Sequence, residues 1–284
     1  MDDASAILHR QRVATPQGSY DGTIRAIVEL VQGLERDAGR TGLSVGIGHP
    51  GSISPATGLM RNSNSLCLNG KPLKQDIEQA LGREIRMAND ANCLALSEAA
   101  DGAAAGAGNV FAVILGTGVG GGVVIDGRIV VGANGIGGEW GHNPLPWLRP
   151  EWDEQRTRCW CGQAGCLETW LSGVGLAADH AHVTQEKISA EEIVERAEAG
   201  DERCNATLAR YEDRLARALA QVVNLLDPEV IVLGGGVSRV SRLYRHVPAL
   251  WDQWIFSDRI VTRLLPARHG DASGVRGAAW LWPK

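Results

Sequence analysis

The segment FAVILGTGVGGGVVIDGRIVVG, residues Phe111–Gly132, contains the pattern G-x-G-x-x-G at Gly116, Gly118 and Gly121, directly after an apolar run. In a dinucleotide-binding fold this pattern opens a helix that carries the pyrophosphate, and an acidic ribose partner stands about 20 residues later. Here the glycines open another apolar β run, and Asp126-Gly127 predicts a tight hairpin turn after it. The segment therefore predicts consecutive strands and disfavours a nicotinamide oxidoreductase. It leaves open a phosphate cradle of backbone amides between two hairpin strands.

The apolar residues on both sides of this segment alternate between helical and strand spacing. Before it, they predict helices over residues 22–39, 72–81 and 91–106, and strands within 43–51 and 83–90. After it, they predict helices over 191–199 and 204–226, strands over 230–233 and within 259–267, and helices beginning near 240 and 271. Such alternation is typical of the α/β class. The chain has 284 residues, enough for two lobes, and we place the division between residues 1–107 and 108–284.

Charge and hydropathy exclude several classes of partner. The chain has 28 basic and 33 acidic side chains, a net charge of -5, and no block of Lys or Arg that would track a phosphodiester backbone. No apolar run reaches the roughly 18 residues needed to cross a bilayer, and the start MDDASAILHRQRV lacks the apolar core of a signal peptide. We therefore expect a cytoplasmic protein that binds neither nucleic acid nor membranes.

Four residues form a candidate metal site. They lie in GEWGHNPLPW and RCWCGQAGCLE and are His142, Cys159, Cys161 and Cys166. Three thiolates and one imidazole suit a closed tetrahedral Zn²⁺ with a structural role. A redox pair of thiols and unrelated buried thiols are the alternatives. We expect a structural zinc that pins a loop with little core of its own.

A second group of candidates carries oxygen ligands. Asn89-Asp90 stands where a predicted strand ends and a helix begins, so Asp90 is either an N-cap or a general base for a substrate hydroxyl. Glu139 and Glu168 bracket the metal candidates. Each Glu alone is more often a solvated surface charge, but their clustering around the metal candidates favours a functional role. If zinc takes one ring nitrogen of His142, the other can donate to a sugar hydroxyl, and the carboxylates can accept hydroxyl protons.

The motifs GTGVGGG, GEWGHNPLP, CWCGQAGCLET and VIVLGGGVS together resemble the ROK family of sugar kinases and sugar-responsive repressors. AND followed by ANCLALSEA, GEWGHNPLPW and the ending HGDASGVRGAAWLW look most like its fructokinase (manno/fructokinase) branch. The resemblance covers nearly the whole chain. It implies an actin-like ATPase fold, with two ribonuclease H-like lobes and the substrates in the cleft between them.

The resemblance also implies an activity and a set of roles. The expected reaction is ATP- and Mg²⁺-dependent phosphorylation of a hexose, most closely fructose to fructose 6-phosphate, by a homodimer. Asp90 looks like the catalytic base, and the sugar hydroxyls would contact Asn89, Glu139, His142 and Glu168. His142 would also join the three cysteines on zinc. Gly116, Thr117 and Gly118 match the second phosphate loop, and Gly234, Gly235 and Gly236 match the adenosine loop.

One part of the family pattern has no counterpart in the sequence. Family members begin with a strand that carries a D-x-G-G-T phosphate loop, and residues 1–20 match only the family segment C-terminal to that loop. We therefore expect the first strand of the N-terminal sheet to be absent, either alone or together with its hairpin partner. Either the true start lies upstream, or the protein keeps its sugar and zinc sites with impaired use of ATP. An exposed sheet edge with unpaired backbone groups predicts poor stability and weak activity.

Two other functions compete with a hexose kinase. A non-catalytic sugar-binding or regulatory protein would keep the sugar residues, but a repressor needs a DNA-binding helix-turn-helix ahead of the first family-like segment, where we see no room for one. A zinc-stapled scaffold would not explain Asn89-Asp90 and two glycine loops. The sequence therefore favours the kinase.

Overall fold

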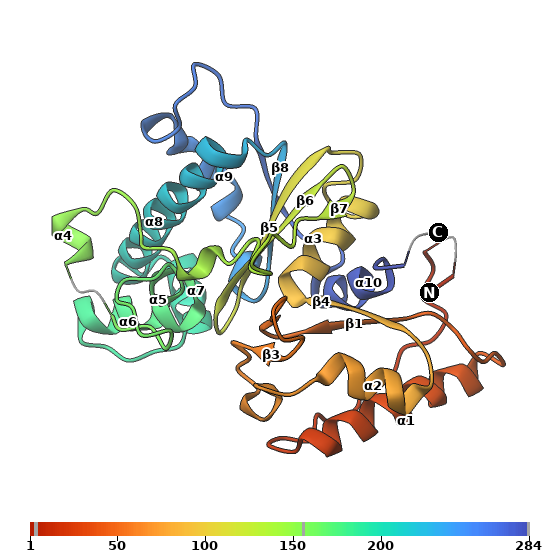
Figure 1. Ribbon diagram of the computed structural model, residues 1–284. Helices are drawn as coiled ribbons and strands as arrows, with labels where there is room; N and C mark the ends of the chain where they lie inside the picture. The colour runs from red at the N-terminus through yellow and green to blue at the C-terminus, as the bar shows by residue number, and fades with distance from the viewer. Residues whose placement is uncertain (3–4, 155–156, 283–284) are drawn as a thin grey trace.

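The computed structural model describes residues 1–2, 5–154 and 157–282. Its N-terminal elements are α1 (Tyr20–Asp37), β1 (Val45–His49), β2 (Ser52–Ile53), β3 (Met60–Arg61), η1 (Leu66–Leu68), α2 (Leu73–Leu81), β4 (Ile85–Asn89) and α3 (Asp90–Ala100). Strands β1 and β4 are parallel, so their carboxyl ends meet and His49 lies opposite Asn89. Helices α1 and α2 pack together beneath these strands (Figure 1). The parallel pairing of β1 and β4 thus brings His49 and Asn89 to one edge of the N-terminal sheet.

The C-terminal sheet is built around the glycine-rich segment. It contains β5 (Asn109–Leu115), β6 (Val119–Ile125), β7 (Arg128–Ile129), β8 (Val230–Gly234) and β9 (Arg263–Pro266), in the order β7-β6-β5-β8-β9. The first three strands are antiparallel neighbours, and β8 and β9 run parallel to β5. Asp126 and Gly127 both have positive φ, 49° and 71°, as a two-residue hairpin turn of the predicted kind requires. The predicted strand–hairpin is confirmed, although β7 has only two residues.

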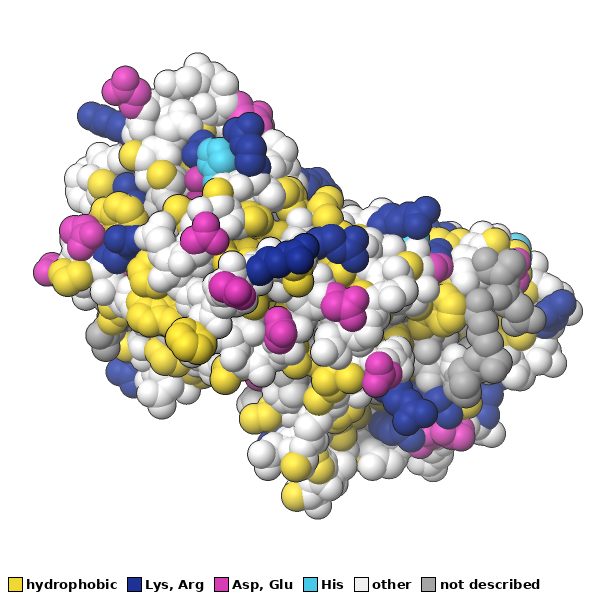
Figure 2. Space-filling view, turned by 90° about the horizontal axis from the view of Figure 1, so that it is seen from above, with side chains coloured by type: hydrophobic (Ala, Val, Ile, Leu, Met, Phe, Trp, Pro, Cys, Tyr) yellow, Lys and Arg dark blue, Asp and Glu magenta, His cyan; other side chains and the backbone are white. Residues whose placement is uncertain are grey.

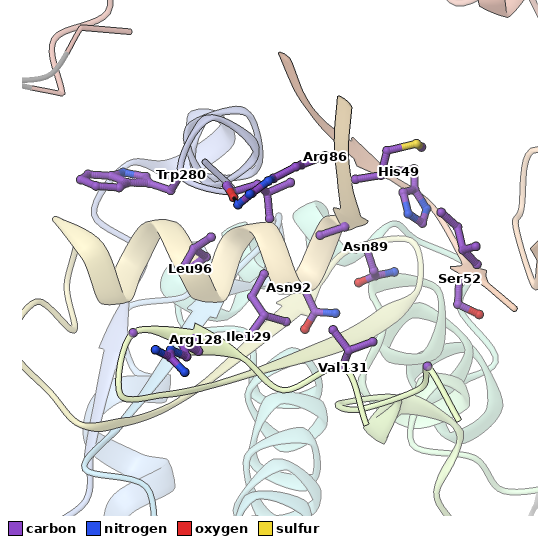
Figure 3. Close-up of a pocket in the computed structure, with 16 residues that line it drawn as sticks. His49, Ser52, Arg86, Asn89, Asn92, Leu96, Arg128, Ile129, Val131 and Trp280 are labelled. Carbon is purple, nitrogen blue, oxygen red and sulfur yellow. Dashed lines mark hydrogen bonds between the residues drawn. The ribbon is translucent and has the colours of Figure 1, made fainter. Parts of the chain in front are cut away.

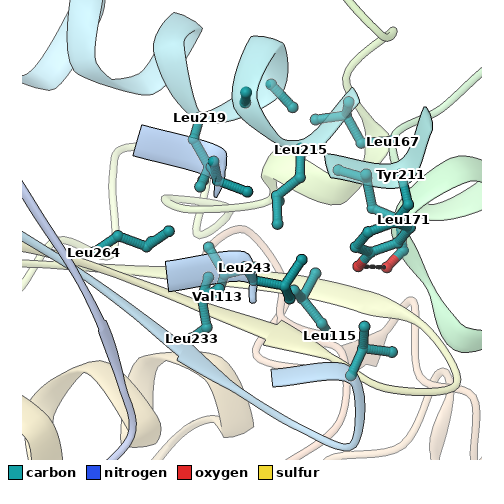
Figure 4. Packing of buried hydrophobic residues seen from close by; sticks show 14 of the residues in the cluster. Val113, Leu115, Leu167, Leu171, Tyr211, Leu215, Leu219, Leu233, Leu243 and Leu264 are labelled. Carbon is teal, nitrogen blue, oxygen red and sulfur yellow. Dashed lines mark hydrogen bonds between the residues drawn. The ribbon is translucent and has the colours of Figure 1, made fainter. Parts of the chain in front are cut away.

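Alternate residues of this sheet face two different layers. Val110, Ala112, Val230 and Val232 pack toward α3 in one hydrophobic cluster. Phe111, Val113, Leu115, Ile231 and Leu233 belong to the larger cluster on the other face, together with Tyr211, Leu215 and Leu219 of α8 (Glu202–Leu226) and Leu243 of α9 (Leu243–Ala249). Figure 4 shows this packing, in which the Tyr211 hydroxyl donates to the Leu171 carbonyl at 2.8 Å. The near-continuous apolar strands are therefore buried on both faces.

The remaining helices are short or lie on the periphery. They are η2 (Trp140–His142), α4 (Pro150–Asp153), α5 (Glu168–Leu171), α6 (Gly173–Thr184), α7 (Ala190–Glu198), η3 (Val237–Arg239), η4 (Trp251–Gln253), η5 (Gly270–Ala272) and α10 (Ser273–Ala279). Among the residues that the structure describes, no helix is both long and apolar enough to cross a membrane. On the face shown in Figure 2, Lys and Arg side chains are interspersed with Asp and Glu.

Helix α10 covers part of the N-terminal sheet, although it comes from the C-terminal end of the chain. It packs against α3 and β1 (Figure 1). The approach is so close that a Cβ at Gly277 would lie 1.7 Å from the Cys93 carbonyl oxygen, and one at Gly46 would lie 1.8 Å from that of Ala278. Only glycine fits at these two points. The division of the chain at residue 107 stays a prediction, and α10 lies with the N-terminal elements.

A buried ion-pair network holds the segment that leads into the cysteine-rich loop. Arg217 on α8 is fully buried and donates to Asp213 at 2.8 Å and to Asp153 at 2.9 Å. It also donates to the carbonyls of Pro146 and Trp147, both at 2.9 Å. Arg214 completes the network through Asp153, at 2.8 Å. These paired charges satisfy backbone carbonyls of a loop whose large apolar side chains Trp147, Leu148 and Trp152 stay exposed.

Candidate active site

The junction of β4 and α3 presents Asn89 and Asp90. Asn89 is the N-cap: its Oδ1 accepts from the Ala91 amide at 2.9 Å, and its Nδ2 donates to the Gly51 carbonyl at 3.0 Å. Asp90 is the first helical residue, and its Oδ1 also accepts from the Ala91 amide, at 2.8 Å. Asn89 therefore supplies the cap, the role that was one of two alternatives for Asp90.

The surroundings of Asp90 hold its pKa above the ordinary value of a carboxyl. Asp90 is exposed to solvent, yet protein surrounds it on most sides and partly desolvates the carboxylate. The Ala91 amide and the nearby His49 oppose this effect in part. His49 is buried, which lowers its own pKa, while its Nδ1 lies 3.1 Å from the Pro50 carbonyl oxygen. A raised pKa in a cleft is typical of a group that exchanges protons.

Glu139 precedes η2, where the charges of the other candidate residues affect its pKa. Partial burial raises its pKa most, and the charges of Asp90 and Glu168 raise it further, whereas His142 lowers it. Asp90, Glu139, His142 and Glu168 are thus brought to one region from distant parts of the chain, and Asn89 is the neighbour of Asp90 in the sequence. The structure assembles the residues that the sequence nominated as sugar ligands, although it assigns none of them a substrate.

Glu168 is held by two donors on different segments. Its Oε2 accepts from the Val119 amide at 3.1 Å, and its Oε1 accepts from the indole N–H of Trp160 at 2.7 Å. Gly118 leaves room for this carboxylate, because a Cβ there would lie 2.6 Å from Oε2. The strand after the glycine loop therefore orients one of the two carboxylates beside the cysteines.

His142, Cys159, Cys161 and Cys166 converge as predicted. Their candidate ligand atoms all lie within 4.8 Å of one another. Cys161 and Cys166 have their sulfur atoms 3.6 Å apart, and the Cys159 sulfur is 3.7 Å from Nδ1 of His142. A tetrahedral site with Zn–S bonds of about 2.3 Å needs sulfur atoms roughly 3.8 Å apart, so the donor set and spacing fit zinc. With Nδ1 facing the cysteines, Nε2 of His142 is left for another partner.

The two glycine loops are neighbours at the carboxyl ends of β5 and β8, where Ile114 pairs with Gly234. Gly235 has φ +85°, and a Cβ on it would lie 2.4 Å from the Leu115 carbonyl oxygen. A cavity of about 200 Å³ is lined by Asp90, Leu94, Ile114, Gly234, Gly235, Gly270, Ser273 and Gly274. Asp90 and two residues of the loop that we expect to hold adenosine, Gly234 and Gly235, therefore line the same cavity. Gly116, Thr117, Gly118 and Gly236 are not among the residues that line it.

A larger cavity of about 520 Å³ opens beside Asn89. Figure 3 shows His49 and Ser52 at one end and Arg86 and Trp280 at the other, with Asn92 between them on α3. The hairpin residues Arg128, Ile129 and Val131 lie opposite the helix (Figure 3). Asn89 lines this cavity and the next residue, Asp90, lines the glycine-loop cavity, so the strand–helix junction separates the two.

Two residues beside the site were missed by reasoning from the sequence. His49 ends β1 opposite Asn89 and lies near enough to Asp90 for that charge to act on it. The rule that selected Asn89-Asp90, a polar residue at the end of a buried strand, would also have selected His49. Trp160 lies between two candidate metal ligands and contacts both Glu168 and His142. Its position inside C-x-C was the available signal, but nothing in the spacing indicates where the indole points.

Comparison with known proteins settles the family. A model of the ROK family matches residues 1–284. The chain belongs to the ROK family. An N-acetyl-D-glucosamine kinase of Escherichia coli O6:H1 is 40% identical over 283 residues, 99% of this chain and 93% of that protein. An N-acetyl-D-glucosamine kinase of Photobacterium profundum is 40% identical over 274 residues, 95% of this chain and 90% of the relative.

Solved structures of ROK proteins share the fold. A ROK hexokinase from Thermus thermophilus superposes with a TM-score of 0.82 at 31% identity, covering 94% of this chain and 88% of that one. A ROK family glucokinase from Streptomyces griseus, in complex with glucose and AMPPNP, gives 0.80 at 30% identity, covering 99% and 93%. The predicted actin-like ATPase fold is confirmed. The fructokinase branch is not supported by these relatives, and an absent N-terminal strand is not shown and stays a prediction.

Proposed function

We propose that this ROK protein transfers the γ-phosphoryl group of ATP to the 6-hydroxyl of a hexose. The observation that carries the proposal is the position of Asp90, which belongs to the polar cluster with Glu139 and also lines the cavity of Gly234 and Gly235. A general base for phosphoryl transfer has to lie within hydrogen-bond reach of the acceptor hydroxyl while that hydroxyl faces the phosphate donor. Asp90 stands between the parts of the site to which we assign these two substrates.

In the proposed reaction Asp90 accepts the proton of the sugar 6-hydroxyl while the oxygen of that hydroxyl forms a bond to the γ-phosphorus. The bond between that phosphorus and the bridging oxygen breaks, and ADP leaves with the electron pair. Asn89, Glu139, His142 and Glu168 hold the other hydroxyls. Backbone amides of residues 116–118 and 234–236 receive the nucleotide, and Mg²⁺ bound with ATP would offset the charge of the transferred group.

For the sugar we propose N-acetyl-D-glucosamine first, because two relatives that are 40% identical over nearly the whole chain are N-acetyl-D-glucosamine kinases. Fructose is the second candidate, because GEWGHNPLPW and HGDASGVRGAAWLW resemble the fructokinase branch. Both sugars offer a primary 6-hydroxyl, so the same chemistry serves either. Glucose is a useful third substrate, since a similar solved structure contains it.

We also propose that His142 and the three cysteines bind one structural Zn²⁺, which would fix the loop that carries Glu168. The four donors leave no open coordination position, so the ion would take no part in the transfer. We also propose a homodimer, which the family resemblance implies. Measuring the mass of the protein in solution tests this independently of the zinc site.

The test is a coupled assay for ADP release with N-acetyl-D-glucosamine, fructose, glucose and mannose, alongside calorimetric binding of each sugar without ATP. Turnover of at least one sugar, with phosphate found on the 6-oxygen, is the expected result. Sugar binding without any turnover would instead favour a non-catalytic sugar-binding protein. Neither binding nor turnover would overturn both functions.

A further inference from the structure

Trp160 occupies an unusual position for a large aromatic residue. It lies between Cys159 and Cys161, and 63% of its surface is exposed, although tryptophan is normally well buried. Its indole N–H donates to Oε1 of Glu168 at 2.7 Å. Its ring meets the imidazole of His142 edge to face, with centroids 5.0 Å apart and planes at 84°. The side chain is therefore exposed and yet tied to two residues of the candidate site.

The backbone on either side keeps Trp160 in this place. The Cys159 amide donates to the Gln163 carbonyl at 2.8 Å, and the Gly162 amide donates to the Cys159 carbonyl at 3.0 Å. Arg158 and Ala164 form an antiparallel bridge across the base of this turn. A tight turn with two candidate metal ligands flanking the tryptophan presents the indole in one orientation, at little entropic cost on binding a ligand.

The contacts of the indole leave 63% of the Trp160 surface exposed. The polar edge is satisfied by Glu168, and His142 touches the ring at one side, so the rest of the ring is an apolar surface at the rim of the polar cluster. A hexose has both hydroxyls, which suit Glu168 and His142, and an apolar face of C–H groups, which suits an aromatic ring. A site built only of carboxylates and imidazole would lack a partner for that face.

We propose that Trp160 is a sugar-contacting residue that helps to determine which hexose is accepted. Its ring packs against the sugar at the end held by Glu168 and His142, opposite the 6-hydroxyl at Asp90. Its N–H holds Oε1 of Glu168 while the Val119 amide holds Oε2, so the remaining lone pairs of that carboxylate point in fixed directions. This inference rests on the proposed function, because it assumes that the cluster binds a sugar.

Three substitutions separate the ring from its hydrogen bond. Trp160→Phe keeps an aromatic ring without the N–H, Trp160→Gln keeps a donor without the ring, and Trp160→Ala removes both. The matched control is Trp152→Phe, at another exposed tryptophan, whose ring contacts the guanidinium of Arg149. Each variant is measured for sugar affinity by calorimetry without ATP, for kcat and KM separately, and for zinc content.

We expect Trp160→Ala to weaken sugar affinity about 10- to 100-fold, because a hydrogen bond to a charged group is lost together with the ring contact. The affinities of Trp160→Phe and Trp160→Gln should lie between those of the parent protein and Trp160→Ala. KM for the sugar should rise in parallel while kcat changes less than about threefold, and the preference between N-acetyl-D-glucosamine and fructose should shift. Zinc content and the Trp152→Phe control should match the parent protein.

Several outcomes would overturn the assignment. Unchanged affinity in Trp160→Ala would remove the contact, and weaker binding accompanied by loss of zinc in all three variants would make Trp160 a structural residue of the loop. A parent protein that binds sugar but does not turn it over would refute the proposed kinase activity while leaving the affinity comparison decisive for Trp160. A parent that binds no sugar would refute both.

Discussion

Asn89 and Asp90 are consecutive residues that line different cavities, Asn89 the one of about 520 Å³ and Asp90 the one of about 200 Å³. The change from strand to helix at this point turns successive side chains to different sides. Because Asn89 already caps α3, the Asp90 carboxylate can be changed without removing the cap. Substitutions of Asp90 can therefore test its chemical role while the N-cap of α3 stays in place.

Asp90→Asn should reduce kcat about 100- to 10 000-fold, because the amide cannot accept the hydroxyl proton. Sugar affinity without ATP should stay within a few-fold of the parent, and thermal unfolding should be nearly unchanged. Asp37→Asn, at the exposed end of α1, is the matched control and should leave turnover intact. Full turnover in Asp90→Asn would contradict the proposed role.

The pH profile should reflect the surroundings of Asp90. A base must be ionised to act, and burial raises the pKa of Asp90, so kcat/KM should fall on the acid side at a higher pH than an ordinary aspartate would give. Protonated His49 lowers that pKa, so His49→Gln should move the acid-side midpoint upward. His182→Gln, on the surface of α6, is the control. A midpoint that moves downward would refute the pairing.

Removing one proposed zinc ligand should loosen the cysteine-rich loop. Cys166→Ser, or a strong chelator added to the parent, should lower the melting temperature and expose residues 157–167 to proteases, because this loop depends on its ligands for order. Cys67→Ser lies outside the cluster and should change neither property. Equal protease resistance with and without chelator would count against a metal.

Gly235→Ala should be far more damaging than Gly236→Ala. The first places a Cβ 2.4 Å from the Leu115 carbonyl oxygen at φ +85°, whereas the second meets nothing within 4 Å. We expect a loss of more than about 1 kcal/mol in unfolding free energy for Gly235→Ala, and a raised KM for ATP. Chemical denaturation and initial-rate kinetics compare the pair directly. Equal behaviour would show that the loop adapts freely.

Arg217→Met should destabilise the protein by about 3–5 kcal/mol, because Asp153 and Asp213 would keep buried charges with a partner missing. Arg196→Met removes two salt bridges between partly exposed residues, to Glu186 and Glu192, and should hardly move the urea midpoint. If both variants unfolded at the same urea concentration as the parent, the buried network would carry no stability.

Local signals in the sequence predicted much of the fold. Asp126-Gly127 forms the hairpin turn because both residues take the positive φ that this turn needs, and the apolar runs of β5 and β8 form strands buried on both faces. Boundaries were predicted less well: the helix expected to continue to residue 106 ends at Ala100. Its continuation, rich in alanine, has good propensity, but Glu98 accepts from the Ala103 amide and draws the chain away from the helix.

The candidate site was predictable where a residue type carries its own chemistry. The cysteines and His142 were found by ligand spacing, and Asn89-Asp90 by their place after a strand. Arg217 and Trp160 were not, because their partners stand far away in the sequence or depend on how a loop folds: Arg217 reaches Asp153 across 64 residues. Residue spacing does not encode such contacts until the helices have packed.

The glycine contacts of α10 have a consequence for biosynthesis. The N-terminal sheet obtains part of its cover from residues 273–279, which leave the ribosome long after β1 and β4 have emerged. Domains usually fold as units, N-terminal first, as they are made. Here the first sheet cannot complete its packing during translation, so the half of the molecule that is synthesised earliest is finished last.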